Sequence, residues 1–248
     1  MKTIVLLSAS MFMTSCIGVY VGRGEMGEST EPGVYCSIDT VPGNFEAIKT
    51  DCVANVHYTQ GEAFNVKLEG DSNEIDNLSV VVNNGVLELT TKKQRNNHRK
   101  VDVFVSAPDL AFFDANGVGN VSLDGDVVFD HKFDLKVNTV GNLSANSINC
   151  SELKVRHDGV GNMNIKAKAL AIDLDNNTVG DMTSALEADR ITVGRYGVGA
   201  SQLNVDCDEL KFTANDCGST SIDGYATTTD IKKDGVGIVN VRNLKNRK

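Results

Sequence analysis

The chain has 248 residues and a formal net charge of −9, with 33 Asp and Glu against 24 Lys and Arg. Because proteins bind nucleic acid largely by neutralising phosphates with Lys and Arg, this balance argues against a nucleic-acid partner. After the N-terminal leader, no stretch reaches the roughly 18 consecutive apolar residues that a membrane-spanning helix needs.

The first 15 residues have the composition of a secretory signal peptide, with Lys2 followed by an apolar run and then small residues. They end in Met13-Thr14-Ser15-Cys16, which resembles the lipobox of bacterial lipoproteins. We therefore expect a lipoprotein signal peptide at 1–15, a lipid on Cys16 and a flexible, Gly-rich tether over 16–35. A plain signal peptide with an incidental cysteine is the alternative. The expected location is the bacterial cell envelope, as an outer-membrane lipoprotein that faces the periplasm or the surface.

The remainder, 36–248, is expected to form a single all-β domain. Residues 36–108 contain short alternating segments, and Asn83-Asn84-Gly85 between two of them indicates a hairpin turn. A repeat fold needs an atypical first unit that covers the end of its core, so we interpret 36–108 as a β cap that merges into the first coils. Residues 109–248 would then form the regular coils.

Seven glycines recur in those regular coils at steps of 22, 20, 19, 19, 19 and 19 residues. They are Gly119, Gly141, Gly161, Gly180, Gly199, Gly218 and Gly237. Apolar residues lie eight and six positions before most of these glycines and four positions after them, as expected for two strands per unit with one inward side each. Units this short leave no room for a crossover helix, so the sequence predicts a parallel β-helix, right-handed by the usual rule for parallel crossovers, with about 19–22 residues per coil.

Between the two strands of each unit lies a corner with Asn or Asp in most repeats, which is typical turn chemistry. These corner residues are Asn116, Asn138, Asp158, Asn177, Asn215 and Asp234. We expect them to form a structural ladder, with cation binding at the acidic members as the lesser alternative. The valine before each glycine is expected to fill the interior, as is Cys217 in the one unit that has cysteine there.

The chemistry-bearing residues give little support for an active site. The four histidines lack the spacings of a zinc site, and we expect no metal and no cofactor. Cys36 and Cys52 are candidates for a disulfide near the cap. One basic run, from Lys92 to Lys100, lies between two expected strands, either as a solvated hairpin loop or as a landing patch for acidic polysaccharide or anionic lipid headgroups. Its cations are Lys92, Lys93, Arg95, Arg99 and Lys100.

Five segments in order carry a resemblance to a known family. They are Val41–Ile48, Val66–Asp71, Asn84–Leu89, Val105–Leu110 and Asn116–Val121. In this order they resemble the putative auto-transporter adhesin family with the head GIN domain, over nearly everything from Val41 onward. The resemblance implies a right-handed β-helix in an envelope lipoprotein, and it supplies no catalytic residues.

Together these features predict a non-catalytic, lipid-anchored envelope protein, an adhesin or binding module that presents a rigid β-helix side to a glycan or an envelope protein. A β-helix that cleaves polysaccharide and a periplasmic module that binds only protein are the alternatives. The sequence displays no repeat-aligned pair of acids for cleavage, and it leaves the oligomeric state open.

Overall fold

The computed structural model describes residues 32–93 and 99–246, and from Gly33 onward they belong to one compact unit. The predicted signal peptide, Cys16, most of the predicted tether and Arg95 lie outside the described residues.

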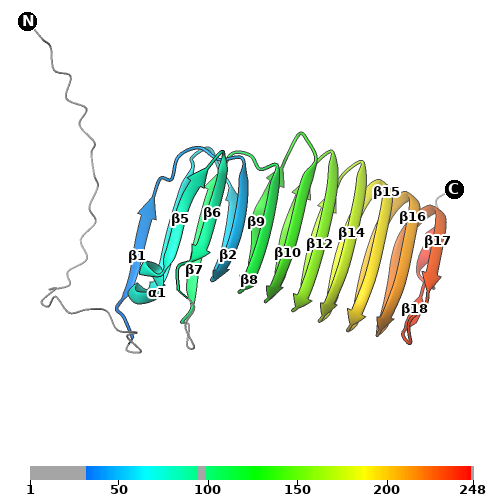
Figure 1. The fold of residues 1–248 in the computed structure, drawn as a ribbon. Helices are drawn as coiled ribbons and strands as arrows, with labels where there is room; N and C mark the ends of the chain where they lie inside the picture. Colours follow the sequence, from blue (N-terminus) through cyan, green and yellow to red (C-terminus); the bar gives the residue numbers. More distant parts are fainter. Residues whose placement is uncertain (1–31, 94–98, 247–248) are drawn as a thin grey trace, which may run out of the picture. The chain divides into compact units, whose positions relative to one another are not determined.

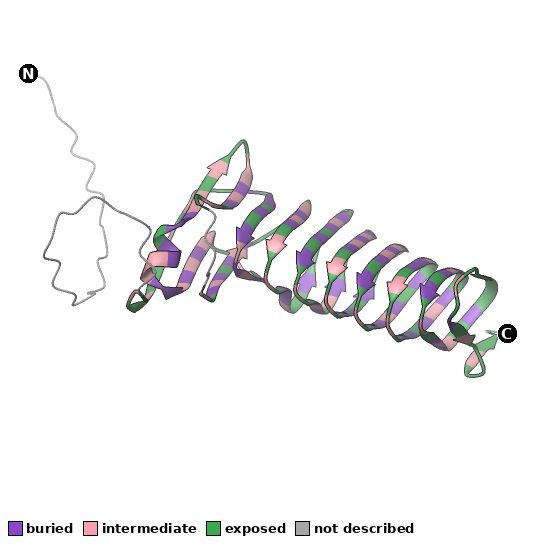
Figure 2. Ribbon diagram, turned by 60° about the horizontal axis from the view of Figure 1, so that its bottom comes forward, coloured by how far each residue is buried: buried purple, intermediate pink, exposed green. Residues whose placement is uncertain are grey.

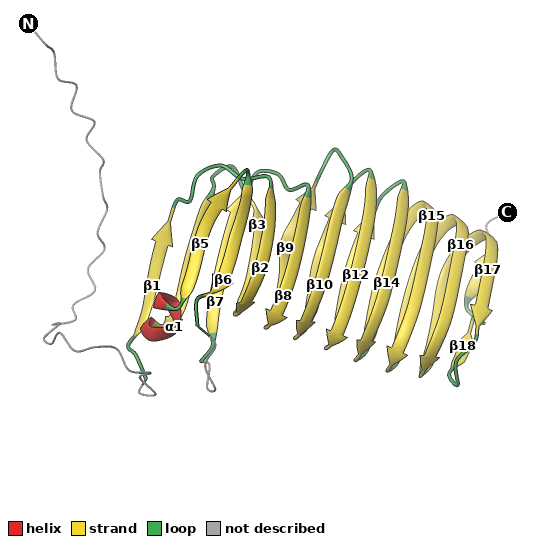
Figure 3. Ribbon diagram, in the orientation of Figure 1, coloured by secondary structure: helices red, strands yellow, loops and turns green. Residues whose placement is uncertain are grey.

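The unit is a parallel β-solenoid built from two ladders of strands (Figures 1 and 3). Ladder A holds the strands that precede the repeated glycines: β8 (Phe112–Val118), β10 (Phe133–Val140), β12 (Glu152–Val160) and β14 (Ala171–Val179). Ladder B holds those that follow them: β9 (Val121–Val128), β11 (Leu143–Asn149) and β13 (Met163–Lys168). Three long strands turn from ladder B into ladder A: β15 (Met182–Val198), β16 (Ser201–Cys217) and β17 (Ser219–Lys233). Strand pairing does not fix the hand of the coil, so the right-handed sense stays a prediction.

Register between coils places like residues above one another. One ladder A column runs through Leu135, Val155, Leu174, Val193 and Phe212, each paired with the next and each at most 1% exposed. Buried residues therefore alternate with exposed or partly exposed ones along most strands of the coils (Figure 2). Each such side chain contributes roughly 1.5–3 kcal/mol of burial free energy, so the core grows coil by coil.

Coil order in space departs from chain order at the N-terminal end. The coil of β2 (Ala47–Val53) and β3 (Asn55–Gln60) lies between two others (Figure 1). On one side is the coil of β6 (Val86–Thr91) and β7 (Val101–Ala107), and on the other is the coil of β8 and β9. Both edges of β2 and of β3 are thereby paired before the regular repeat begins.

Antiparallel strands complete the predicted cap. β4 (Asn65–Asp71) pairs with β7 and with β1 (Tyr35–Thr40), and β5 (Leu78–Asn83) pairs with β6. The β5–β6 turn has Asn84 at φ 49° and Gly85 at φ 76°, and the two strands pair antiparallel, which confirms the predicted hairpin turn. The short helix α1 (Ser72–Asp76) places Ile75, 3% exposed, in the core at this end.

At the opposite end β18 (Ile238–Asn240) and β19 (Leu244–Asn246) pair with the first part of β17. In the described ranges, no helix has the length and apolar character needed to cross a membrane.

The valine before each glycine points to solvent, so its predicted place in the interior is wrong. Val118, Val140, Val160, Val179 and Val198 are 47–56% exposed, and Cys217 is exposed as well. The reason lies in the alternation itself. Residues an even number of positions before the glycine face the core, and this valine is one position before it. The interior place belongs instead to the preceding residue, as with buried Thr139 and Thr178.

The candidate pair of cysteines belongs to different strand pairings. Cys36 lies opposite Gly70 of β4, and Cys52 lies opposite Gly117 of β8. No disulfide joins them in the described part of the chain. The pKa of the Cys52 thiol is raised to about 12, mainly by burial, so this thiol is protonated at neutral pH.

Candidate functional site

The repeated glycines are required by coil stacking. A Cβ on Gly161 would come 1.8 Å from the carbonyl oxygen of Gly141, and one on Gly180 would come 2.1 Å from the carbonyl of Gly161. The same contact recurs at every glycine of the column, at 1.8–2.2 Å from the coil below. No side chain fits there. The predicted structural role of this column therefore rests on backbone contact between successive coils.

A second column, which sequence reasoning missed, follows the glycines directly. The side-chain oxygen of Asn120 accepts from the backbone N–H of Asn142 at 2.8 Å, Asn142 accepts from Asn162 at 2.9 Å, and Asn162 accepts from Asp181 at 2.9 Å. Asn55 starts the series and Ala200 ends it. We call this the Asn120 ladder. The signal for it in the sequence is the recurring Gly-Asn and Gly-Asp dipeptide.

The predicted corner ladder lies on the outer face of ladder A, three residues before each repeated glycine. Asn116, Asn138, Asp158 and Asn177 are aligned in register and exposed, and Tyr196 follows in the next coil before Asn215. Asn177 donates to Asp158 at 3.1 Å, and Asn116 donates to Asp114 at 3.2 Å. Asp234 is also exposed. Across the described ranges, no group of three or more His, Cys, Asp or Glu side chains could hold a metal ion.

The basic run connects β6 to β7, which are successive strands of one coil and do not pair with each other, so the predicted hairpin loop is wrong. Lys92 Nζ donates to the carbonyl of Asp76 at 2.8 Å. Arg99 Nε lies 3.8 Å from Asp71, and Lys100 Nζ lies 3.2 Å from Asp102. Lys93 is exposed. Three of the four described cations of this run therefore contact groups of the chain itself.

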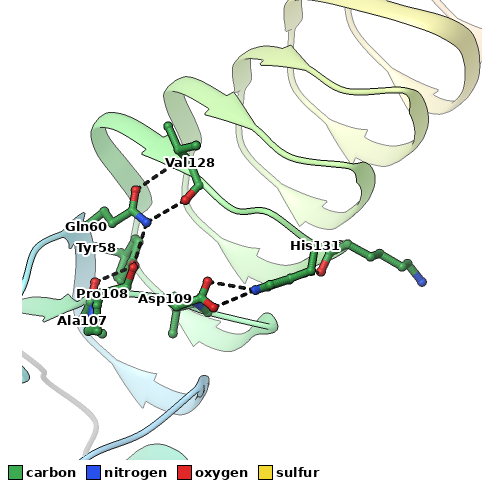
Figure 4. A network of polar contacts seen from close by, with 9 residues as sticks. Tyr58, Gln60, Ala107, Pro108, Asp109, Val128 and His131 are labelled. Atoms are coloured by element: carbon green, nitrogen blue, oxygen red, sulfur yellow. Dashed lines mark hydrogen bonds and ion pairs between the residues drawn. The ribbon is translucent and has the colours of Figure 1, made fainter.

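A network of polar contacts joins the cap to the first regular coil (Figure 4). The Gln60 side chain donates to the carbonyls of Pro108 and Val128 and accepts from the Val128 N–H, all within 2.8 Å. His131 Nε2 lies 2.8 Å from the Asp109 carboxylate. The pKa of His131 is raised, first by its hydrogen bond to the Lys132 carbonyl and second by its contact with Asp109. Because the Gln60 side chain bonds only backbone groups here, we interpret this network as structural, holding neighbouring coils together.

A cluster of polar side chains lies inside the solenoid. Arg195 is 0% exposed, and its guanidinium donates to Asn176, to Ser201 and to the carbonyls of Thr178, Tyr196 and Gly180, at 2.9–3.2 Å. The carboxylate of Asp216 is 4.0 Å from Arg195 Nε. Burial lowers the pKa of Arg195. These contacts fix the corner backbone of two neighbouring coils.

His157 lies in the same inward column as Asn176 and Arg195, two coils before Arg195. It is 0% exposed, and neither ring nitrogen has a hydrogen-bond partner among the described residues. Burial lowers its pKa to about 4, so the imidazole is neutral at pH 7.

Ser122, His57 and Asp102 are the residue types of a catalytic Ser-His-Asp triad, and they lie close together. His57 Nδ1 is 2.8 Å from Ser122 Oγ, and His57 Nε2 is 3.5 Å from Asp102. The imidazole is also stacked on Phe104, and its Nδ1 is 3.6 Å from Asp124. Ser122 is only 7% exposed, so its hydroxyl is not presented to a substrate. We interpret this group as a polar contact between neighbouring strands.

The outer face of ladder B carries a hollow of about 530 Å³. Its floor includes Ala185, which interrupts a row of longer side chains between Lys166 and Asn204. Thr183 and Gln202 flank it in the neighbouring row. The other polar side chains that line it are Asn146, Asn164 and Asp223. A second hollow of about 310 Å³ shares Lys166, Ala185 and Asn204 and extends toward Lys168, Glu187 and Asp206. We call the two together the Ala185 hollow.

This surface presents amide, hydroxyl, ammonium and carboxylate groups on adjacent parallel strands. Strands hold such groups at fixed spacings of about 4.8 Å between coils. The arrangement can make several hydrogen bonds to an extended polar ligand. The sequence did not reveal it, because a single alanine in an otherwise polar row has no motif.

Two comparisons with solved structures agree with this fold. A putative adhesin from Bacteroides fragilis is similar, at 24% identity and a TM-score of 0.70, over 86% of this chain and 97% of that one. A putative adhesin from Parabacteroides distasonis is similar at 18% identity and a TM-score of 0.60, over 84% and 98% of the two chains. No curated protein sequence matches the chain.

A family model described as "Putative auto-transporter adhesin, head GIN domain" matches residues 44–205. That span runs from the cap into the ladder B face and includes Ala185, and it confirms the resemblance found in the sequence. The chain therefore belongs to the putative auto-transporter adhesin, head GIN domain family.

Proposed function

We propose that the protein is a non-catalytic binding protein of the bacterial cell envelope that uses the Ala185 hollow to bind a glycan. Family membership supports a binding role in the envelope. The observation that carries the proposal is the hollow itself, where Ala185 leaves space between Lys166 and Asn204 and polar rows border it on both sides.

The chemistry of the hollow fits a polyhydroxylated ligand. Sugar hydroxyls both donate and accept hydrogen bonds, and this surface offers carboxamides that do the same, together with a lysine and carboxylates. Its strands are rigid and already paired, so little conformational entropy is lost when a ligand binds. The hollow is wide and open, which favours reversible binding to a segment within a glycan chain.

Membrane attachment is the second part of the proposal. A lipid on Cys16 would hold the domain at the outer membrane, with the segment to residue 35 as a tether. Replacing Cys16 with Ala should move the protein from the membrane fraction to the soluble fraction and abolish incorporation of labelled fatty acid. Incorporation that persists in this variant would contradict the anchor.

The hollow is tested by filling it. Ala185→Gln gives this position a side chain like those of its row, so the surface stays polar and the strand stays intact. A glycan that binds the wild-type protein should bind this variant about tenfold more weakly or worse, which corresponds to about 1.4 kcal/mol. Ala111→Gln is the matched control, because Ala111 is an exposed alanine at the edge of ladder A. Equal loss in both variants would show that the hollow is not the site.

The same samples separate binding from cleavage and from protein recognition. Chromatography of the glycan after incubation should return chains of unchanged length, since the proposal includes no catalytic group. Shortened chains would favour a polysaccharide-cleaving β-helix. Failure to bind any glycan would favour an envelope protein as the partner.

A further inference from the structure

Tyr196 breaks the corner ladder on the outer face of ladder A. The same position holds Asn177 in the coil before and Asn215 in the coil after. Tyr196 is 38% exposed, and the described aromatic core residues Phe113, Phe133 and Phe212 are fully buried in the interior. A large ring therefore replaces a small amide at one place in this column, beside the column of exposed valines that includes Val179 and Val198.

The ring is held over a glycine. Gly194 precedes Tyr196 by two residues and faces the same side of β15, and an added Cβ at Gly194 would meet Tyr196 Cε2 at 2.6 Å and its Oη at 3.0 Å. The tyrosine side chain thus leans back along the strand into space that any other residue at 194 would fill. A neighbouring carboxylate oxygen, from Asp175, also lies above Gly194, 2.5 Å from the same added Cβ.

The backbone beneath the ring is fixed from inside the core. Arg195, which is fully buried, donates to the carbonyl oxygen of Tyr196 at 3.1 Å and to that of Gly180 at 2.9 Å. Gly197 follows at φ 136°, and its added Cβ would lie 2.2 Å from the carbonyl of Thr178. The segment on both sides of Tyr196 is therefore locked, and a ring mounted on it is preorganised.

Polar groups lie beside the ring in the two neighbouring coils and at its Gly194 end, where a stacked ligand would present its hydroxyls. Asn177 and Asn215 flank it in register, and both are exposed. At the Gly194 end, Asp175 forms an ion pair with Arg156, so this corner carries both a donor and an acceptor with no net charge. Such a site favours an uncharged ligand with many hydroxyl groups.

We propose that Tyr196 is a stacking platform for one pyranose ring of a neutral oligosaccharide, with Asn177, Asn215 and the Arg156–Asp175 pair bonding its hydroxyls. Tyrosine supplies a rigid, partly apolar face at low entropic cost, and the C–H groups of a pyranose pack on such a face. This site lies on ladder A, separate from the Ala185 hollow on ladder B. It goes beyond the proposed function and does not depend on it.

Tyr225 is the matched comparison, because it is 45% exposed on the outer face of ladder B. Lys245 Nζ lies 5.6 Å from the centroid of the Tyr225 ring, a cation–π contact that occupies the aromatic face. Exposure alone therefore does not make a platform, and a Tyr225 variant serves as the control.

The test is binding of neutral hexasaccharides of glucose, mannose, xylose and N-acetylglucosamine to the full-length protein, by calorimetric titration and by tyrosine fluorescence. The chain contains no Trp, so tyrosine emission is not masked. Tyr196→Asn installs the residue that the neighbouring coils carry, so the fold is retained while the ring is lost. Tyr196→Phe keeps the ring, and Tyr225→Asn removes an exposed ring from ladder B.

We expect at least one hexasaccharide to bind the wild-type protein and to lose affinity about tenfold or more with Tyr196→Asn. Tyr196→Phe should stay within about threefold of wild type, and Tyr225→Asn should be unchanged. Wild-type affinity in Tyr196→Asn, or no binding of any of the four probes, would overturn the platform. If Ala185→Gln abolishes binding while Tyr196→Asn leaves it intact, the platform fails and the proposed function stands.

Discussion

The side-chain oxygen of Asn142 accepts a hydrogen bond from the backbone N–H of Asn162, one coil further on, at 2.9 Å. Each asparagine of the Asn120 ladder uses a side-chain oxygen to satisfy the corner of the next coil, at the point where the glycines bring the backbones together. Corners are where a solenoid leaves backbone groups without strand partners. The Asn120 ladder is therefore a structural device that repeats with the coils.

Replacing Asn142 with Ala should lower the free energy of unfolding by about 1 kcal/mol, because the Asn162 N–H loses its acceptor. Asn142→Asp should be close to wild type, since Asp181 already holds an equivalent place in the ladder. Urea denaturation followed by circular dichroism measures both. An alanine variant with the wild-type midpoint would mean that water replaces the ladder at no cost.

Gly161→Ala should be far more damaging than an ordinary glycine substitution. The new Cβ would lie 1.8 Å from the Gly141 carbonyl, so two coils must separate, and we expect a loss of about 3 kcal/mol or more. Gly125→Ala is the control, because Gly125 has φ 78° with nothing within 4 Å of the added Cβ. That variant should lose only about 1–2 kcal/mol from backbone strain. Equal losses in the two variants would refute close coil contact as the reason for the glycine column.

Arg195→Met should destabilise the C-terminal coils by about 3–5 kcal/mol, since it leaves buried carbonyls and the Asp216 carboxylate without the guanidinium. The double variant Arg195→Met with Asp216→Asn should recover about 1 kcal/mol or more of that loss, because it removes the buried charge. Thermal and urea unfolding of four proteins decides the matter: the wild type, Arg195→Met, Asp216→Asn and the double variant. Additive losses would show that Arg195 and Asp216 do not interact.

His157 should make the fold sensitive to acid. Its pKa is about 4 in the folded protein against 6.5 for an unperturbed imidazole, so the unfolded chain takes up a proton first as the pH falls. Stability from this group is complete above pH 6.5 and decreases from there toward pH 4, by on the order of 3 kcal/mol. His157→Val copies Val137, the residue at that position in the preceding coil. The difference in stability between wild type and variant should change with pH over this window, and a constant difference would contradict the burial argument.

Much of the fold could be predicted from the sequence, because the backbone of each coil requires glycine and apolar residues at fixed positions. Glycine at a fixed step and apolar residues two apart, such as Leu153 and Val155, predict stacked parallel strands, and the Asn84-Gly85 turn predicts its hairpin. The side of the strand on which Val140 lies was misjudged, although period-two alternation from Leu135 already places it outside.

Other features depend on relationships that the sequence does not express. The coil of β2 and β3 receives neighbours on both edges from segments later in the chain, so chain order hides the order in space. Arginine is usually a surface residue. The burial of Arg195 is explained by the carbonyl oxygens of Thr178, Gly180 and Tyr196, which accept hydrogen bonds from its guanidinium. The Ala185 hollow exists because of the neighbours of Ala185 in register, and these follow from pairing.

The most direct test of the account is a glycan-array screen of the full-length, detergent-solubilised protein beside Ala185→Gln, with the length of each bound glycan checked afterwards by chromatography. We expect saturable binding by the wild-type protein, a loss of about tenfold or more in the variant, and glycans of unchanged length. Shortened glycans would contradict the non-catalytic role, and a variant that binds as well as wild type would contradict the site.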